Sequence, residues 1–187
     1  MVKATFIAIA GIMLWTGRPA PASGPANGSP AAAPAARTSV PWLSLQEAQD
    51  RSKGEPRVII MDIYTDWCYW CKVMEKNTYE DPRVAAYMGQ KFYSVRFNAE
   101  NRGRVTWKGQ SFAYNPDYKV NELVMSLTRG NLSFPTTVVI TPDNRAPQFI
   151  SGYLKPADLE PVLKYFGEEA YKTRSYHDFL KSFSPSW

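Results

Sequence analysis

The chain has 187 residues, of which 44% are hydrophobic and 14% aromatic, enough to build the core of one ordinary domain. Its net charge of +5 comes from scattered lysines and arginines, and the lack of a basic stripe argues against a nucleic-acid partner. Two cysteines and a single histidine are too few for a structural zinc site, which takes about four ligands, so we expect no metal.

The N-terminal segment has the pattern of an export signal. Lys3 provides a positive charge, residues 4–15 are apolar, and residues 20–22 are small enough to precede a cleavage site, which predicts a signal peptide over 1–22. The apolar run is short for a bilayer span. An uncleaved anchor is the alternative, and only then would the protein contact a membrane. Either way we predict an exported protein, periplasmic or extracellular, in a compartment where disulfides persist.

Residues 23–41 are rich in proline and alanine, and such a segment cannot bury a core, so we predict a disordered linker there. The folded domain should follow over residues 42–187. At its start, Ser44 and Glu47 have the spacing of a capping box, which predicts a helix over 45–53.

The two cysteines, Cys68 and Cys71, lie where a strand should end and a helix should begin. The run over 58–64 is apolar and β-branched, which is typical of a buried strand, and residues 72–76 are good helix formers. Because the first turn of a helix has unpaired N–H groups and a positive dipole end, the pKa of the Cys68 thiol should be lowered there. The pair thus predicts thiol–disulfide exchange, with Cys68 as the exposed attacking thiol and Cys71 as the sheltered resolving thiol.

A purely structural disulfide is the alternative for this pair. Such a bridge stabilises a fold by closing a long loop, and a bridge between cysteines three positions apart constrains little chain. We therefore favour a redox role, which requires no cofactor.

The rest of the domain should alternate helices and strands. Asp81 can cap a short helix that has Pro82 at its first position and that Gly89 ends. Residues 99–119 lose this periodicity and predict a long loop, whose aromatic side chains serve either packing or binding. In the tail, from residue 168, a further helix should pack one apolar face onto the core. The other expected elements are strands over 92–98, 136–140 and 148–150 and helices over 120–129 and 156–166.

The order of these elements resembles the thioredoxin family over roughly residues 42–166. Trp67 directly precedes the cysteine pair, as in thioredoxins, and Asp62 takes the position of the carboxylate that thioredoxins keep buried under the active site. Arg96 resembles the position of a basic residue near that carboxylate. The Phe134–Pro135 bond resembles the segment whose cis-proline faces the cysteines, so the resemblance implies a cis bond there.

Residues 67–74 fit the Trp-Cys-x-Trp-Cys-Lys-x-Met pattern of secreted bacterial thioredoxin-like proteins. The resemblance implies a thioredoxin-like α/β fold, with a central mixed β-sheet flanked by helices, an insertion before the cis-proline strand and an extra C-terminal helix. Between the cysteines stand Tyr69 and Trp70 instead of the Gly-Pro of ordinary thioredoxin, so the direction of the reaction stays open.

The function that the resemblance implies is a thiol–disulfide oxidoreductase of the cell envelope. It would act on protein or peptide disulfides and dithiols and would depend on a redox partner protein. Cys68 and Cys71 would form its redox-active disulfide, and Asp62 would assist proton movement at Cys71. The residues expected to hold the substrate are Trp67, Trp70, Phe134 and Pro135.

Two alternatives belong to other functional classes. The domain could be a binding adaptor or chaperone whose disulfide stays oxidised, or a carrier that passes electrons to one dedicated enzyme. Reduction of insulin-type disulfides would distinguish an oxidoreductase from the adaptor, and activity with a single partner would indicate the carrier.

Overall fold

The computed structural model describes residues 39–143 and 145–187. The predicted signal peptide and nearly all of the predicted linker fall within residues 1–38, outside the described residues. Val40 is buried in the core, so the packed chain includes residues ahead of Trp42, the expected start of the domain.

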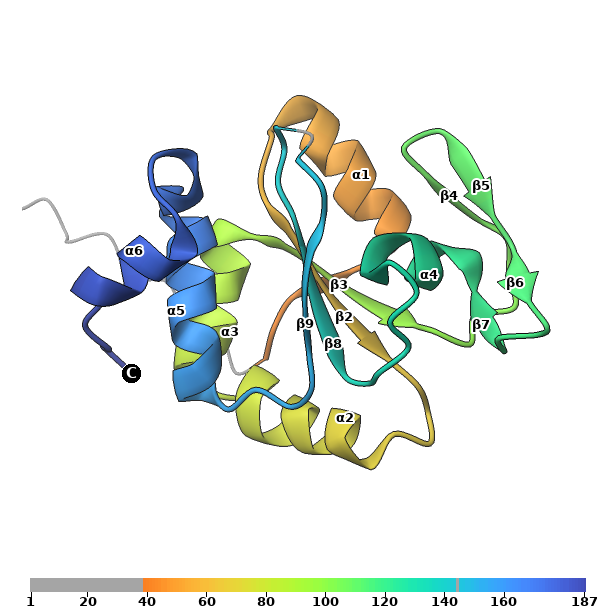
Figure 1. Cartoon of the computed structure of the whole chain (residues 1–187), viewed down its shortest axis with the longest axis horizontal. Coiled ribbons are helices and arrows are strands. Elements are labelled where there is room, and N and C mark those ends of the chain that lie inside the picture. The colour runs from red at the N-terminus through yellow and green to blue at the C-terminus, as the bar shows by residue number, and fades with distance from the viewer. Residues whose placement is uncertain (1–38, 144) are drawn as a thin grey trace, which may run out of the picture. The chain divides into compact units, whose positions relative to one another are not determined.

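Five strands form the central sheet: β1 (Trp42–Leu43), β2 (Ile59–Tyr64), β3 (Tyr93–Asn98), β8 (Thr136–Ile140) and β9 (Gln148–Ser151). Their order across the sheet is β1-β3-β2-β8-β9 (Figure 1). The strands β1 and β2 run parallel to β3, whereas β8 is antiparallel to both β2 and β9. The mixed sheet predicted from the sequence is therefore confirmed.

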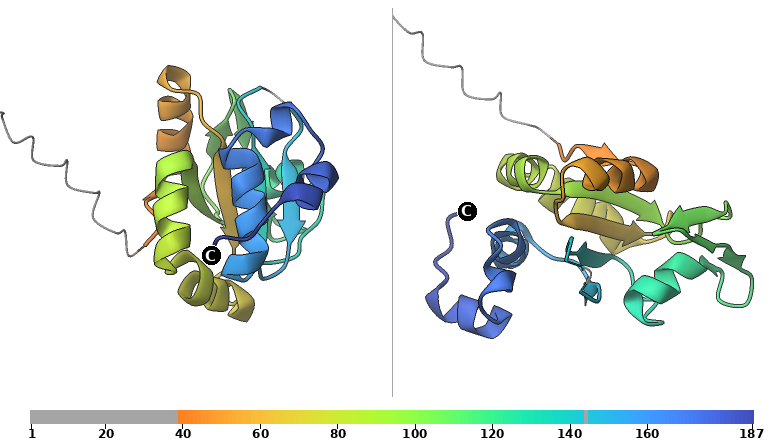
Figure 2. Two further views of the ribbon diagram at one scale, coloured as in Figure 1. Left: turned by 90° about the vertical axis from the view of Figure 1, so that its left-hand side faces the viewer. Right: turned by 90° about the horizontal axis from the view of Figure 1, so that it is seen from above.

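Four α-helices cover the two faces of this sheet: α1 (Leu45–Gly54), α3 (Pro82–Lys91), α4 (Glu122–Thr128) and α5 (Pro156–Gly167). The helices α3 and α5 lie side by side on one face, and α1 and α4 lie on the other (Figure 1; Figure 2). Side chains of β2 alternate between the two resulting cores, because successive residues of a strand point to opposite faces. Ile60 packs with α3 and α5, while Ile59 and Met61 pack on the side of α1 and α4.

The local signals at helix ends are largely confirmed. In the capping box of α1, the Glu47 N–H donates to Ser44 Oγ at 3.1 Å and the Ser44 N–H donates to Glu47 Oε2 at 2.9 Å. Asp81 caps α3 through its side chain. Gly89 does not end α3 as predicted, because glycine also adopts the helical conformation, and the helix continues to Lys91.

The predicted loop over 99–119 contains short strands instead, and a further one takes the first two positions of the helix predicted over 120–129. They form two hairpins, β4 (Val105–Trp107) with β5 (Gln110–Phe112), and β6 (Tyr114–Asn115) with β7 (Val120–Asn121). Lys108 and Gly109 connect the first hairpin with positive φ angles of 48° and 78°, the backbone of a tight two-residue turn that lysine does not signal. Trp107 and Phe112 are buried in the core on the α4 side, so these two aromatic side chains serve packing.

The single helix predicted for the tail is divided into a 3₁₀-helix, η2 (Ala170–Lys172), and α6 (Tyr176–Ser182). The division occurs because the Ser175 side chain accepts a hydrogen bond from the Asp178 N–H and starts a new helix. Phe179 is buried next to Tyr165 of α5, as expected for core packing, whereas Leu180 is exposed.

Candidate active site

Cys68 and Cys71 form a disulfide where the chain leaves β2 and enters α2 (Tyr69–Met74). Cys68 is the N-cap residue of α2, and its Sγ accepts a hydrogen bond from the Cys71 N–H at 3.1 Å. The exposed fraction is only 4% for Cys68 and 2% for Cys71. The expectation of an exposed Cys68 is thus wrong for the oxidised protein, because its sulfur turns inward to bond Cys71 and neighbouring aromatic side chains occupy the surface.

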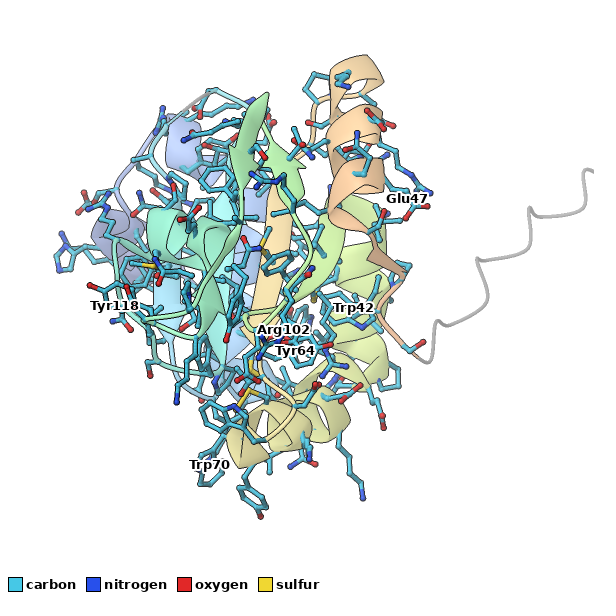
Figure 3. The ribbon with its side chains drawn as sticks, turned by 90° about the vertical axis from the view of Figure 1, so that its right-hand side faces the viewer. Trp42, Glu47, Tyr64, Trp70, Arg102 and Tyr118 are labelled. Atoms are coloured by element: carbon cyan, nitrogen blue, oxygen red, sulfur yellow. A yellow bond between two sulfur atoms is a disulfide. The ribbon has the colours of Figure 1, made fainter. Side chains whose placement is uncertain are left out.

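These neighbouring aromatic side chains are unusually exposed: 68% for Trp67, 69% for Tyr69 and 54% for Trp70. Figure 3 shows Trp70 projecting from the end of α2. The Trp70 ring stacks on Tyr153, with the ring centroids 5.7 Å apart. Tyr153 lies far along the chain, just past β9, and no local pattern in the sequence connects it to the cysteines. Such a cluster of exposed apolar side chains is typical of an interaction surface.

The segment that precedes β8 reaches the same surface. Its Phe134–Pro135 bond is cis, which confirms what the family resemblance implies. The Phe134 ring lies edge-on to Trp67, with the centroids 6.2 Å apart. The structure therefore places Phe134 beside the residue that precedes Cys68, while Pro135 itself is buried.

Asp62 is a buried carboxylate on β2, the strand that leads to the cysteines. Its neighbours in the sheet are Arg96 on β3 and Thr137 on β8. The Arg96 Nε lies 3.4 Å from Asp62 Oδ2, close enough for an ion pair but longer than an ordinary hydrogen bond. Burial raises the pKa of Asp62 to about 7, even though the Arg96 charge and the Tyr79 hydroxyl lower it.

Glu75 holds the guanidinium of Arg96 from the other side. It belongs to η1 (Glu75–Tyr79), a π-helical segment that continues α2. Both Nη atoms of Arg96 pair with its carboxylate, one of them at 2.9 Å, and the guanidinium lies over the Tyr64 ring, 4.4 Å from the centroid. Burial lowers the pKa of Arg96, but the bond to Glu75 and the charge of Asp62 outweigh it and leave that pKa raised. Glu75 could not be predicted from the sequence as part of the site, because nothing local connects it with β3.

Within residues 39–143 and 145–187, no group of three or more His, Cys, Asp or Glu side chains could hold a metal ion. The same part of the chain contains no helix that is long and apolar enough to cross a bilayer. His177 is exposed on α6, next to Asp178 at 3.8 Å, and takes no part in the site.

The site thus combines three parts: a disulfide at the start of a helix, an exposed aromatic surface around it, and a buried carboxylate that titrates near neutral pH. The first part can exchange electrons with another thiol pair. The second can hold a partner, and the third can accept and release a proton.

Comparison with known proteins agrees with this geometry. Residues 26–168 match the Thioredox_DsbH family, whose description reads "Protein of unknown function, DUF255". A solved structure of a DsbH oxidoreductase is similar with a TM-score of 0.51 and 20% identity, over 81% of this chain and 96% of that one. Together with the strand order, these findings confirm the predicted thioredoxin-like fold.

Several curated relatives match part of the chain, among them the following two. The thiol:disulfide interchange protein DsbD of Salmonella typhi is 40% identical over 68 residues, which cover 34% of this chain and 12% of DsbD. Human spermatogenesis-associated protein 20 is 28% identical over 119 residues, which cover 63% of this chain and 13% of that protein. The chain therefore spans only a small part of the length of these relatives. The family match covers most of the chain, and on that basis the chain belongs to the Thioredox_DsbH family.

Proposed function

We propose that the protein is a thiol–disulfide oxidoreductase of the cell envelope. The observation that carries the proposal is the Cys68–Cys71 disulfide at the start of α2, bordered by exposed aromatic side chains. A disulfide that serves only stability does not need exposed rings around it, whereas one that reacts with other proteins needs a surface that holds them. The family match and the partial similarity to a thiol:disulfide interchange protein support the same proposal.

In the reductive direction, the Cys68 thiolate attacks one sulfur of a substrate disulfide. The substrate S–S bond breaks, one substrate sulfur leaves as a thiolate, and a mixed disulfide joins the other to Cys68. The Cys71 thiolate then attacks Cys68 Sγ, the mixed disulfide breaks, and the second substrate thiolate leaves. Two electrons have passed to the substrate, and a redox partner protein returns the Cys68–Cys71 pair to the dithiol. In the oxidative direction the same steps run in reverse.

Asp62 is the group we assign to proton movement at Cys71. A carboxyl group with a pKa of about 7 can accept a thiol proton and release it again near neutral pH. Its burial gives it this raised pKa against the opposing charge of Arg96, whereas an exposed aspartate would be ionised throughout that range.

The substrate chain would lie across the exposed rings. Trp67 precedes Cys68, Trp70 lies between the two cysteines, and Phe134 contacts Trp67 from the segment before β8. An extended peptide could pair with the backbone next to Pro135 as an added strand. This assignment gives the substrate three aromatic contacts around the reacting sulfur.

Trapping of mixed disulfides tests the roles of the two cysteines. The Cys71→Ser variant should accumulate mixed disulfides with a reactive peptide disulfide, because the resolving thiol is missing, and Cys68→Ser should accumulate few. The wild-type protein should also reduce the disulfides of insulin in the presence of a thiol donor. The reverse trapping pattern would contradict the assignment of Cys68 as the nucleophile.

A thioredoxin-like adaptor is the second candidate, and the burial of both cysteines favours it. In that case the disulfide would persist in excess reductant, and the insulin assay would show no activity. The reduction potential of the pair distinguishes the two candidates directly, because a disulfide that takes part in exchange must be reducible at the potential of its compartment.

We also propose that the protein is exported and belongs with secreted bacterial thioredoxin-like proteins. The support is the sequence of residues 1–22, the predicted signal peptide, and of residues 23–41, the predicted linker, together with the motif over 67–74. Mass spectrometry of the mature protein should find an N-terminus within the linker. An intact Met1 in a cytoplasmic pool would contradict export.

A further inference from the structure

A pocket of about 430 Å³ lies beside Trp67, the residue that directly precedes Cys68, and it is bounded on the other side by the insertion before β8. One wall consists of Trp67 and Phe134, whose rings are in edge-on contact. The other wall comes from the turn between β6 and β7, which contributes Tyr118, Lys119 and Val120. The insertion therefore forms part of the surface next to Trp67 and Phe134.

The backbone of Tyr118 is held in place by the turn between β6 and β7, and 57% of the residue is exposed. The Asn115 Oδ1 accepts hydrogen bonds from the N–H groups of Asp117 and Tyr118, at 3.0 and 3.2 Å. Figure 3 shows Tyr118 at the surface of this region. A ring carried on a fixed backbone loses less conformational entropy when a ligand covers it than a ring carried on a mobile loop.

The hairpin is in turn anchored to the end of β3. The buried side chain of Asn121 donates from Nδ2 to the carbonyl oxygens of Asn101 and Gly103, at 3.2 and 3.1 Å. The Asn121 N–H also donates to the Ala99 carbonyl oxygen at 2.7 Å. Because these bonds join the hairpin to the segment that directly follows β3, they fix the backbone of the hairpin relative to the end of that strand.

The walls of the pocket select for an uncharged, apolar occupant. Leu132 and Val120 add aliphatic surface to the three aromatic rings. The two charged side chains at the pocket, Glu100 and Lys119, have opposite signs, so neither an acidic nor a basic group gains a net attraction there. Burial of an apolar side chain against Tyr118 is favourable, whereas burial of a charged one is not.

We propose that this pocket is a specificity subsite for polypeptide disulfides, and that Tyr118 is the residue of the insertion that selects the occupant. The occupant is an apolar side chain one or two residues from the reacting cysteine of the substrate. Trp67 lines the pocket and directly precedes Cys68, so the pocket begins one residue from the reacting cysteine of this protein. An extended substrate chain advances about 3.3 Å per residue, so a side chain one or two residues from the substrate cysteine would reach the pocket. The inference rests on the proposed disulfide exchange and adds a substrate class to it.

Three disulfides test the proposal: a peptide disulfide with leucine beside the cysteine, the same peptide with serine in place of leucine, and hydroxyethyl disulfide. Tyr118→Ala should lower kcat/KM for the leucine peptide about tenfold, which corresponds to about 1.4 kcal/mol. It should change the other two by less than about threefold, because they place nothing large in the pocket. Tyr118→Phe should retain the preference. Tyr176→Ala, which removes a partly exposed tyrosine of α6, is the matched control and should leave all three rates unchanged.

Binding provides a readout that does not depend on turnover. Peptides with serine in place of the cysteine should change the tryptophan fluorescence of the protein, and the leucine form should bind more tightly to the wild type than to Tyr118→Ala, again by about tenfold. Equal loss for all three disulfides, or equal binding of both peptides, would overturn the subsite. If the wild type exchanges with no disulfide but still prefers the leucine peptide, the proposed function is wrong and the subsite stands as a peptide-binding pocket.

Discussion

The disulfide end of the molecule and its C-terminal helices use the same kinds of side chains in opposite ways. Around the disulfide, aromatic rings such as Trp67 and Trp70 are exposed, and the charges of Asp62 and Arg96 are wholly or largely buried. In the C-terminal helices, rings such as Phe179 are buried, and ion pairs such as that between Asp178 and Lys181 lie at the surface. Buried rings and exposed charges, as in the C-terminal helices, stabilise a fold. Exposed rings and buried charges, as around the disulfide, cost stability, so their presence there indicates function.

The largest expected effect lies in the C-terminal helices. Phe179→Ala should lower the free energy of unfolding by roughly 3–5 kcal/mol, because the ring packs against Tyr165 and Phe183 in the core. Urea denaturation measures this loss, and disulfide exchange of the folded variant should stay within twofold of wild type. Leu180→Ala, on the exposed side of the same helix, is the control and should change stability by less than about 0.5 kcal/mol. A loss of less than 1 kcal/mol for Phe179→Ala would contradict the stabilising role of the buried rings in the C-terminal helices.

At the disulfide end, removal of the buried charge should increase stability. The pKa of Asp62 is about 7 in the folded protein and about 4 in an unfolded chain. Below pH 4 both states hold the proton. As the pH rises from 4 to 7 the unfolded state releases it first, so the wild type loses stability. At pH 8, Asp62→Asn should therefore be more stable by roughly 2–4 kcal/mol, measured by urea denaturation.

The stability gained by Asp62→Asn should depend on pH. The advantage of Asp62→Asn should shrink to nearly nothing at pH 4, and its disulfide exchange should be slower than that of the wild type near pH 7. Parallel stability curves for the two proteins between pH 4 and pH 8 would show that Asp62 is not held protonated by its surroundings.

The exposed rings should matter for exchange and not for folding. Trp70→Ala should lower kcat/KM for polypeptide disulfides about tenfold, about 1.4 kcal/mol, because the ring offers contact area next to the reacting sulfur. Its free energy of unfolding should fall by less than about 1 kcal/mol, since only the stack on Tyr153 is lost. A large loss of stability with unchanged exchange would assign Trp70 to packing, like the rings of the C-terminal helices.

The smallest expected effect concerns Glu75, which raises the pKa of Asp62 through its charge and also holds Arg96. Glu75→Gln should lower the pKa of Asp62, because it removes a negative charge and leaves Arg96 free to pair with Asp62 alone. Titration of the Asp62 carboxyl carbon by NMR measures this change. Glu80→Gln removes an equal charge from an exposed position in the next turn and should shift the titration less. Equal shifts in both variants would exclude a specific role for Glu75.

The features that the sequence predicts well are those with a local signal. Ser44 and Glu47 predict the start of α1, and the β-branched run predicts β2. The family resemblance correctly implies the cis bond before Pro135. Burial and ion pairing of Asp62 next to Arg96 also follow the resemblance. In each case a few neighbouring residues, or a motif shared with a family, contain the information.

The features that were missed depend on residues far apart in the chain or on unusual backbone. The stack of Trp70 on Tyr153 joins α2 to the end of β9, and the bond of Glu75 to Arg96 joins η1 to β3. The first hairpin of the insertion turns at Lys108, in a conformation that lysine rarely adopts. Hydrophobic periodicity and secondary-structure propensity predict neither distant contacts nor unusual backbone conformations, because both describe one segment of the chain at a time.

The capping bond of Cys68 has a consequence for the reduced protein. In the disulfide form the Cys68 sulfur already accepts a hydrogen bond from the Cys71 N–H, so the atom that caps α2 is also the atom that reacts. When the bond is reduced, a thiolate at this position keeps that acceptor role and strengthens it, since hydrogen bonds to ionised groups are roughly twice as strong as neutral ones. Both oxidation states of the protein can therefore share one backbone arrangement, and cycling between them requires little movement of α2.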